Sequence, residues 1–198
     1  MRAIALLVTA VALCLTPAMT SAVGPDPGKL PQTTTLPSSA SPAFRARMAA
    51  LWRGIAHDAP VLAMSAFFPR SAYLQVKAVA DAASDYRGRL VANYRLDIHA
   101  AHELLGRGAR DARLVGVRVP REWAWIVPGY CANRVGYWHA PGARLLYREG
   151  GRLRSFGIFS LISWRGEWYV VHLGIWNQPG SIVSPSSGVG VFGPPGGC

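Results

Sequence analysis

The N-terminal half of the chain carries apolar residues at the spacing of amphipathic helices. The first such stretch begins at Ser41, a favourable N-cap, followed by Pro42, which suits the first turn of a helix. Its apolar positions recur every three or four residues and are Phe44, Met48, Leu51, Trp52 and Ile55. Asp58 and Pro60 end this helix, and a shorter one follows that stops at Pro69.

A second long helix is predicted from a cap near Ser84 to Gly106, a natural stop. With a rotation of about 100° per residue, its apolar face centres on Tyr94. The other members of that face are Leu90, Val91, Ile98, Ala101 and Leu105. One acidic residue, Asp97, falls at the edge of the face, about 60° from its centre. We therefore expect a helix buried on one side, with a carboxylate at the margin of the core.

From Arg113 onward the apolar residues alternate with polar ones, which is the period of β-strands. Gly-rich and Pro-rich turns separate the stretches, so we expect an antiparallel meander. The predicted strands are "RLVGVRVP", "EWAWIVP", "NRVGYWH", "ARLLYRE", "LRSFGIFSLISW" and "EWYVVHLGIW". A tight turn at residues 165–167 joins the last two and is predicted to bring Trp164 near Trp168.

Helices followed by strands predict an α+β fold, in which N-terminal helices pack on a curved antiparallel sheet of about five or six strands. We expect one such domain over residues 41–176. Residues 23–40 are rich in Pro, Ser and Thr, which predicts a linker that buries nothing. Residues 177–198 are rich in Gly, Pro and Ser, so no regular structure is predicted for this tail, which ends in Cys198.

Two stretches resemble the nuclear transport factor 2-like superfamily. "ALWRGIAHDAPVLAMSAFFPRSAY" is similar to its first unit, in which two helices separated by a short acidic break lead into an "FFP...Y" segment. "SFGIFSLISWRGEWYVVHLG" is similar to its last two long strands, and the resemblance covers most of residues 43–176. It implies a cone-shaped sheet wrapped around helices, with an apolar pocket at the open end. It does not select a function, because members include dehydratases, isomerases and domains that only bind or assemble.

Residues 1–22 have the pattern of a secretory signal peptide. Arg2 precedes an apolar run too short to cross a membrane, and small residues follow it up to Ala22. Cleavage after Ala18 is the alternative to cleavage after Ala22. A lipid anchor at Cys14 is disfavoured because the residue before it is not small. We therefore expect a secreted or envelope-associated protein without a transmembrane span after cleavage.

Removal of the signal peptide would leave two cysteines, Cys131 and Cys198. In an oxidising compartment two cysteines most simply form one disulfide. The alternative is a reactive Cys131 thiol assisted by His139, the nearest histidine in the sequence. We expect the disulfide, because secreted proteins seldom retain a free thiol.

The formal net charge of +11 raises the question of a polyanionic partner. Lys29 and Lys77 are the only lysines, so 19 of the 21 basic residues are arginine, which indicates a GC-rich genome and, with the export signal, an actinobacterial origin. The arginines are spread singly between Arg45 and Arg165, without a nucleic-acid-binding motif. We expect no nucleic-acid partner. The remaining explanations of the charge are attraction to anionic envelope polymers or phospholipid headgroups, and simple solubility.

An enzyme would need an acid or a base in its pocket, and Asp97 is the candidate because burial would raise its pKa. His172 is its candidate partner, and Tyr137 is a candidate donor to a substrate oxygen. The alternatives are an ion pair for Asp97, a structural histidine and a packing tyrosine. A zinc site at His99 and His102 is disfavoured, because the two are three positions apart and His99 points away from the apolar face. No cofactor-binding motif is present, and we expect no cofactor.

Binding is the main hypothesis: an exported domain whose aromatic-lined pocket holds an apolar or glycan ligand or a protein partner. The residues expected to line that pocket are Trp123, Trp125, Tyr137, Trp138 and Trp168. Aromatic rings suit sugars and lipids, and they suit the core of the domain equally. The alternative hypothesis is a small pocket enzyme of the dehydratase or isomerase type, with Asp97 as general base.

Overall fold

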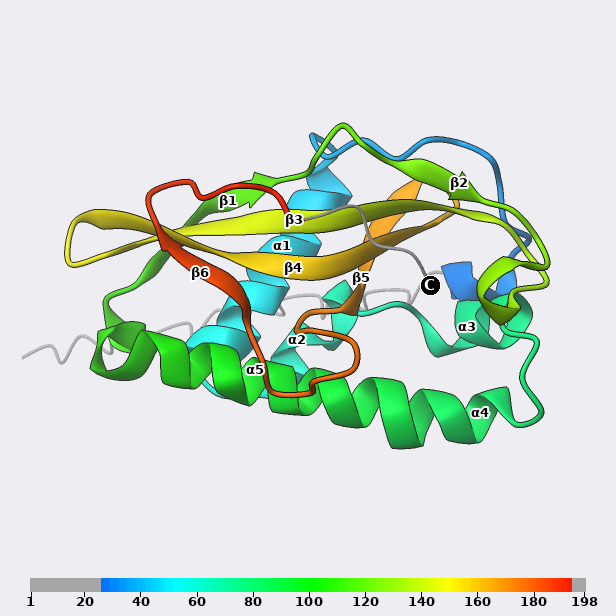
Figure 1. Ribbon diagram of the computed structural model, residues 1–198, viewed down its shortest axis with the longest axis horizontal. Coiled ribbons are helices and arrows are strands. Elements are labelled where there is room, and N and C mark those ends of the chain that lie inside the picture. The colour runs from blue at the N-terminus through cyan, green and yellow to red at the C-terminus, as the bar shows by residue number, and fades with distance from the viewer. Residues whose placement is uncertain (1–25, 194–198) are drawn as a thin grey trace, which may run out of the picture.

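The computed structural model describes residues 26–193 (Figure 1). The predicted signal peptide at residues 1–22 and the predicted half-cystine Cys198 lie outside the described residues, so both remain predictions. Within the described part, no helix combines the length and the apolar content needed to cross a membrane. The fold is α+β, as the sequence predicts: helices from the N-terminal half pack on an open, six-stranded antiparallel sheet.

Two long strands, β3 (Tyr137–Glu149) and β4 (Arg152–Trp164), form the centre of the sheet. A two-residue turn joins them, and both of its residues, Gly150 and Gly151, have positive φ. Strands β1 and β2 lie one after the other along the outer edge of β3, and β5 and β6 do the same along β4 (Figure 1). The four shorter strands are β1 (Arg113–Arg118), β2 (Ala124–Ile126), β5 (Glu167–His172) and β6 (Val183–Ser187).

Strand β3 differs from the prediction, which divided it into two strands at a Pro141–Gly142 turn. The structure has one strand through both residues. Residues of β3 up to His139 pair with β2, and residues from Arg144 onward pair with β1. Pro141 and Gly142 lie between these two paired stretches. The ladder on the outer edge of β3 is therefore interrupted there, and a proline, which has no N–H to donate, is tolerated at such a position. His139, predicted as the last residue of a strand beside that turn, is instead a buried residue within the continuous strand.

The hairpin between β4 and β5 is present, but its register differs from the prediction by one residue. The turn consists of Arg165 and Gly166, both with positive φ. Trp164 therefore lies opposite Glu167, and Trp168 lies one position further along β5. Because directly opposed residues share a face of the sheet, the two tryptophans lie on opposite faces and do not form the predicted pair. Both indoles are buried.

The first predicted helix is α1 (Pro42–Ala56), and it crosses the sheet in Figure 1. The hydroxyl of Ser41 caps it by accepting a hydrogen bond from the N–H of Phe44 at 3.0 Å. All five apolar positions predicted for this helix are buried. Two shorter helices follow, α2 (Pro60–Ala63) and α3 (Arg70–Val76).

The second predicted helix is a continuous run made of α4 (Ala82–Asp85), the π-helical segment η3 (Tyr86–Val91) and α5 (Ala92–Leu105). It begins two residues before the predicted cap, because the carboxylate of Asp81 accepts a hydrogen bond from the N–H of Ser84. Its predicted apolar face is confirmed, since the buried residues include Leu90, Tyr94, Ile98, Ala101 and Leu105. In Figure 1 this long helix runs along the sheet, roughly parallel to β3 and β4.

Aromatic contacts fix the helices against the sheet. The ring of Phe67 stacks on Tyr94 of α5 with centroids 4.3 Å apart. The next residue, Phe68, meets Trp164 of β4 edge-on at 6.1 Å, and its N–H donates to the carbonyl of Val170 at 2.9 Å. The segment between α2 and α3 therefore covers the outer edge of β5. Truncation of a buried aromatic side chain lowers the free energy of unfolding by about 3–5 kcal/mol. The contacts of Phe67 and Phe68 therefore stabilise the position of the segment that leads into α3.

The segment expected to be an unpacked linker is bound to the sheet over its described part, residues 26–40. The indole N–H of Trp164 donates to the carbonyl of Pro27 at 2.8 Å, and the side-chain amide of Gln32 donates to the carbonyl of Ser163 at 3.0 Å. The prediction missed this contact because it depends on single groups, a backbone carbonyl and one glutamine side chain, which the composition of the segment does not reveal.

The tail, expected to lack regular structure, contributes the edge strand β6, which pairs with β4. Val183 is its one buried residue. A Cβ atom on Gly157 of β4 would lie 2.6 Å from the side chain of Val183, so this close approach requires a glycine in β4. The guanidinium of Arg144 in β3 donates to the carbonyl of Ser184 at 2.8 Å and so binds the same strand.

Candidate functional site

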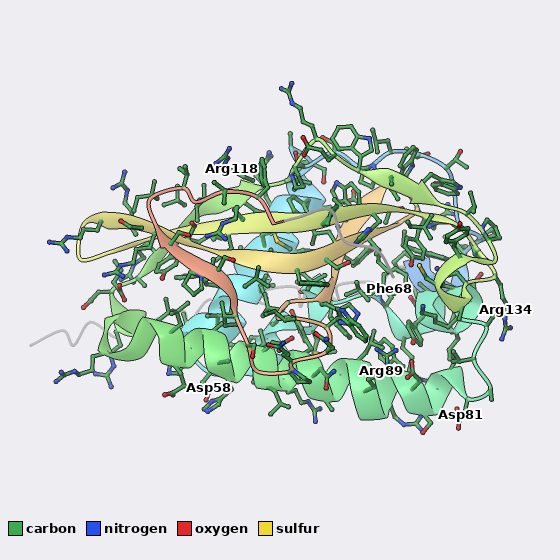
Figure 2. All side chains as sticks on the ribbon, in the orientation of Figure 1. Asp58, Phe68, Asp81, Arg89, Arg118 and Arg134 are labelled. Carbon is green, nitrogen blue, oxygen red and sulfur yellow. The ribbon has the colours of Figure 1, made fainter. Side chains whose placement is uncertain are left out.

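A cavity of about 200 Å³ lies at the end of the sheet that carries β2 and β5. Its walls come from α3, the segment η3, the loop after β2 and the ends of strands β2 to β5. Two of its residues, Phe68 and Arg89, lie between the sheet and the long helix in Figure 2. The apolar wall consists mainly of Phe68, Val76, Leu90, Ile126, Ile162 and Val171. Trp176, which is 50% exposed, adds an indole where the cavity meets solvent.

Arg89 reaches the cavity from the π-helical segment, a local widening of a helix that is frequent at functional sites. Its Nε and Nη2 atoms donate to the two carboxylate oxygens of Asp85 at 2.7 and 2.6 Å. The hydroxyl of Tyr73 donates to the same carboxylate and accepts from Arg89 at 3.1 Å. The hydrogen bonds from Arg89 lower the pKa of Asp85, whereas burial raises the pKa of Tyr73. Arg89 and Asp85 therefore neutralise each other beside the cavity.

Lys77 lies where the end of α3 meets the loop after β2. A backbone hydrogen bond from the N–H of Arg134 to the carbonyl of Val76, at 2.7 Å, joins the two segments. The ammonium of Lys77 donates to the carbonyl of Cys131 at 2.7 Å. Burial, and after it the charge of Arg89, lowers the pKa of Lys77. None of the ion pairs among residues 26–193 includes this ammonium.

Two histidines line the cavity on either side of Ser160, which lies in β4. The Nε2 atom of His139 in β3 lies 2.7 Å from the Ser160 hydroxyl. On the other side, His172 is the residue opposite Ser160 in β5. A β-bulge at Val171 shifts the register of β5, and as a result Val171 and His172 both line the cavity although they are consecutive.

Both histidines are neutral at pH 7. Burial lowers the pKa of His139. Burial also lowers the pKa of His172 to about 4, and the positive charges of Arg89 and Lys77 act in the same direction. A neutral imidazole carries one N–H donor and one acceptor nitrogen, so each ring offers the cavity polarity without charge.

Of the three predicted catalytic residues, the structure brings His172 and Tyr137 to the cavity. The Tyr137 hydroxyl accepts a hydrogen bond from the side-chain amide of Asn133 at 2.9 Å, which leaves its own proton to donate. Burial raises the pKa of Tyr137, so the hydroxyl stays protonated at pH 7.

The third predicted catalytic residue, Asp97, is buried as expected but does not line the cavity. Its two carboxylate oxygens accept hydrogen bonds from the backbone N–H groups of Gly174 and Gly180, each at 2.9 Å. Burial raises its pKa, and the two hydrogen bonds act against that shift. Asp97 thus ties the turn after β5 to the long helix and is not placed as a base for a ligand in this cavity.

The predicted aromatic set does not form one site, and Tyr137 is the member that lines the cavity. Trp168 is fully buried in the core, and Trp123 is 39% exposed. Trp125 and Trp138 contact each other edge-to-face at 5.4 Å. The indole N–H of Trp138 is bound to the carbonyl of Thr34 in the N-terminal segment. The tryptophan that does line the cavity, Trp176, was not predicted.

The histidines considered for zinc have other partners. His99 lies 2.9 Å from the carboxylate of Asp58, and His102 lies 2.9 Å from the carbonyl of Ile55. Throughout residues 26–193, no group of three His, Cys, Asp or Glu side chains is placed to hold a metal ion.

Sequence reasoning missed Lys77, Arg89, His139 and Ser160 as cavity residues. One feature of the sequence singles out Lys77, which is one of two lysines in a chain whose other basic residues are arginines. No such feature marks the others, because the cavity joins segments that are far apart in the sequence.

Comparison with protein-family models, with curated proteins and with solved structures finds no match for this chain.

Proposed function

We propose that this protein is an exported, non-catalytic binding domain whose cavity holds a small organic molecule with an apolar body. The observation that carries the proposal is the composition of the cavity wall, which combines apolar side chains with polar ones that include no Asp or Glu among the lining residues. Ligand pockets combine apolar walls with a few orienting polar groups in this way.

The size of the cavity bounds the ligand. A volume of about 200 Å³ corresponds to roughly seven water volumes of about 30 Å³ each, so the ligand has on the order of ten non-hydrogen atoms. The half-exposed Trp176 at the cavity offers an aromatic face to such a molecule. A whole glycan chain or a protein segment would exceed this volume, so we favour a small apolar ligand among the predicted partners.

The resemblance to the nuclear transport factor 2-like superfamily implies an apolar pocket at the open end of a curved sheet, and the cavity here lies between α3, η3 and the end of an open sheet. The resemblance supports a pocket at this place and does not choose between binding and catalysis. Export to the cell envelope or beyond rests on the N-terminal sequence pattern, and attraction to anionic envelope polymers rests on the net charge of +11.

Native mass spectrometry of the protein purified from the secreted fraction of its host tests the proposal. We expect a retained small molecule that is lost from a variant with a filled cavity, Val171→Trp. Val115→Trp is the matched control, because Val115 is also a strand valine but is 52% exposed. Circular dichroism establishes that both variants fold. A ligand retained equally by both variants would contradict the proposal.

A small pocket enzyme is the second candidate, favoured by the two neutral imidazoles in the cavity. His172, and not Asp97, would then be the proton acceptor. Incubation of the retained ligand with the protein in deuterated water tests this candidate. Deuterium uptake at a carbon atom, lost in His172→Gln, would support the enzyme, and an unchanged isotope pattern would exclude proton abstraction from carbon.

A further inference from the structure

The cavity wall contains one positive charge, that of Lys77, that takes part in no ion pair within residues 26–193. No Asp or Glu oxygen of that part of the chain lies within 4.0 Å of the Lys77 ammonium. Its ammonium has three N–H donors, and the structure gives it one protein acceptor, the carbonyl of Cys131 at 2.7 Å. Two donors are therefore left for a ligand.

Asp85, the acid bound to Arg89, does not supply the missing charge. Both of its oxygens are engaged, because Arg89 donates to each of them and the Tyr73 hydroxyl donates as well. Arg89 and Asp85 cancel, so the net charge that this group of side chains presents to the cavity is that of Lys77 alone.

The remaining polar groups of the cavity are neutral hydrogen-bonding partners. His139 and His172 are uncharged at pH 7. The Tyr137 hydroxyl is protonated and accepts a hydrogen bond from Asn133, so its proton remains available to donate to a ligand. Such a site offers hydrogen-bond donors to an anionic group of a ligand, and the single positive charge of Lys77 balances one negative charge. A positively charged ligand would be repelled.

We infer that the ligand of this cavity is a small monoanion of the carboxylate class with an apolar body, and that Lys77 binds its carboxylate. This inference rests on the proposed binding function and specifies its ligand. A charge-assisted hydrogen bond in a partly desolvated site is stronger than a neutral one, so the cavity should prefer a carboxylate over an uncharged head group on the same tail. Contact of the apolar body with the apolar side chains supplies the rest of the affinity.

Calorimetric titration of the full secreted protein with octanoate, 1-octanol and octylamine tests the inference, because the three compounds share one tail and differ in the charge of the head group. We expect octanoate to bind on the order of tenfold more tightly than 1-octanol, and octylamine to bind most weakly. The Lys77→Met variant should lose the preference for octanoate, and Lys77→Arg should keep it. The chain offers a matched control in Lys29→Met, since Lys29 is the other lysine and is exposed.

A second readout reports on Lys77 directly. In protein labelled with ¹³C at the ε-carbon of lysine, the two lysines give separate NMR signals, and this label leaves the N–H donors of the ammonium intact. Octanoate should raise the pKa of the Lys77 signal, because a bound anion favours the charged amine, and 1-octanol should leave it unchanged.

The outcomes separate this inference from the proposed function. Equal affinity for octanoate and 1-octanol would overturn the carboxylate assignment and leave the apolar pocket intact. A preference for octanoate that survives in Lys77→Met, or a Lys77 signal that octanoate does not move, would overturn the role of Lys77. No binding of any of the three compounds would contradict the proposed pocket itself and this inference with it.

Discussion

The Oδ2 atom of Asp97 accepts a hydrogen bond from the backbone N–H of Gly174, 77 positions further along the chain, at 2.9 Å. The Oδ1 atom of the same carboxylate accepts from Gly180. One buried side chain thus fixes both ends of the turn that carries Trp176 to the cavity. A Cβ atom on Gly174 would lie 2.5 Å from the carboxylate, so the contact also requires a glycine at that position.

We expect Asp97→Ala to lower the free energy of unfolding by about 1–3 kcal/mol, because two backbone donors lose their acceptor. Asp97→Asn should cost less, since the amide oxygen preserves one acceptor. Urea denaturation measures both values. Asp111→Ala, which removes an exposed carboxylate, is the control and should change stability by less than about 0.5 kcal/mol. Equal stability of the Asp97→Ala and Asp111→Ala variants would show that the turn does not depend on Asp97.

His172 makes the stability of the fold depend on pH. Its pKa is about 4 in the folded protein, below the ordinary value of 6.5, because burial and the charges of Arg89 and Lys77 disfavour its protonation. Between these two values the unfolded chain binds more protons than the folded chain, so stability falls as the pH is lowered from 6.5 to 4. One pKa unit corresponds to about 1.4 kcal/mol, which makes the expected loss a few kcal/mol.

The His172→Gln variant should therefore lose less stability than the wild type over this pH range. Part of the pH dependence of stability that remains in His172→Gln should come from His139, because burial also lowers the pKa of His139. Thermal unfolding followed by circular dichroism at half-unit pH steps measures the slopes. His57→Gln, which changes an exposed histidine, should behave as the wild type does. Parallel curves for His172→Gln and the wild type would contradict the shifted pKa.

The helices and most strands could be predicted because each carries its own periodic pattern of apolar residues. Tyr94 and the residues around it predict a buried helical face, and the structure confirms it. Strand β6 could not be predicted in this way, because it sits at an edge, contains a proline and buries one side chain. It is held by backbone pairing with β4, which leaves no pattern in its sequence.

The cavity could be predicted only in part. Tyr137 and His172 were found because they lie in strands whose pattern is clear. His139 was missed because Pro141 and Gly142 look like a turn, and the interruption between β2 and β1 that accommodates them is a property of the assembled sheet. Asp97 was found for its burial, but burial does not show which atoms a carboxylate faces. Here the partners are backbone N–H groups brought in by a distant turn.

The predicted disulfide between Cys131 and Cys198 remains to be measured. A bridge that closes a loop of this length is expected to contribute about 4 kcal/mol. Intact-mass analysis of the protein purified from its host without reductant should show two fewer protons than the reduced chain, and alkylation should require a reductant. Reduction should lower the melting temperature of the wild type and leave that of Cys131→Ser unchanged. Alkylation of both cysteines without reductant would contradict the bridge.

Arg144 is a fully buried arginine without an acidic partner in the described chain. Its guanidinium donates to the carbonyl of Ser184 and the hydroxyl of Ser155, each at 2.8 Å, whereas its Nε atom has no hydrogen-bond partner among the described residues. Burial and the nearby charge of Arg118 lower its pKa, which shows that the charged form is held at a cost. Replacement of a buried charge by an apolar side chain of similar volume is often neutral or stabilising.

We therefore expect Arg144→Met to unfold at the same temperature as the wild type or at a higher one, as measured by differential scanning calorimetry. Arg144→Ala should be destabilised, because it leaves a cavity where the buried side chain was. Arg148→Met, an exposed change on the same strand, is the control for the loss of one positive charge. The hydrogen bond to Ser184 is the argument for the opposite result, since it ties the tail to the sheet. If Arg144→Met unfolds well below both the wild type and Arg148→Met, that bond outweighs the cost of burying the charge, and β6 depends on the guanidinium for its place in the fold.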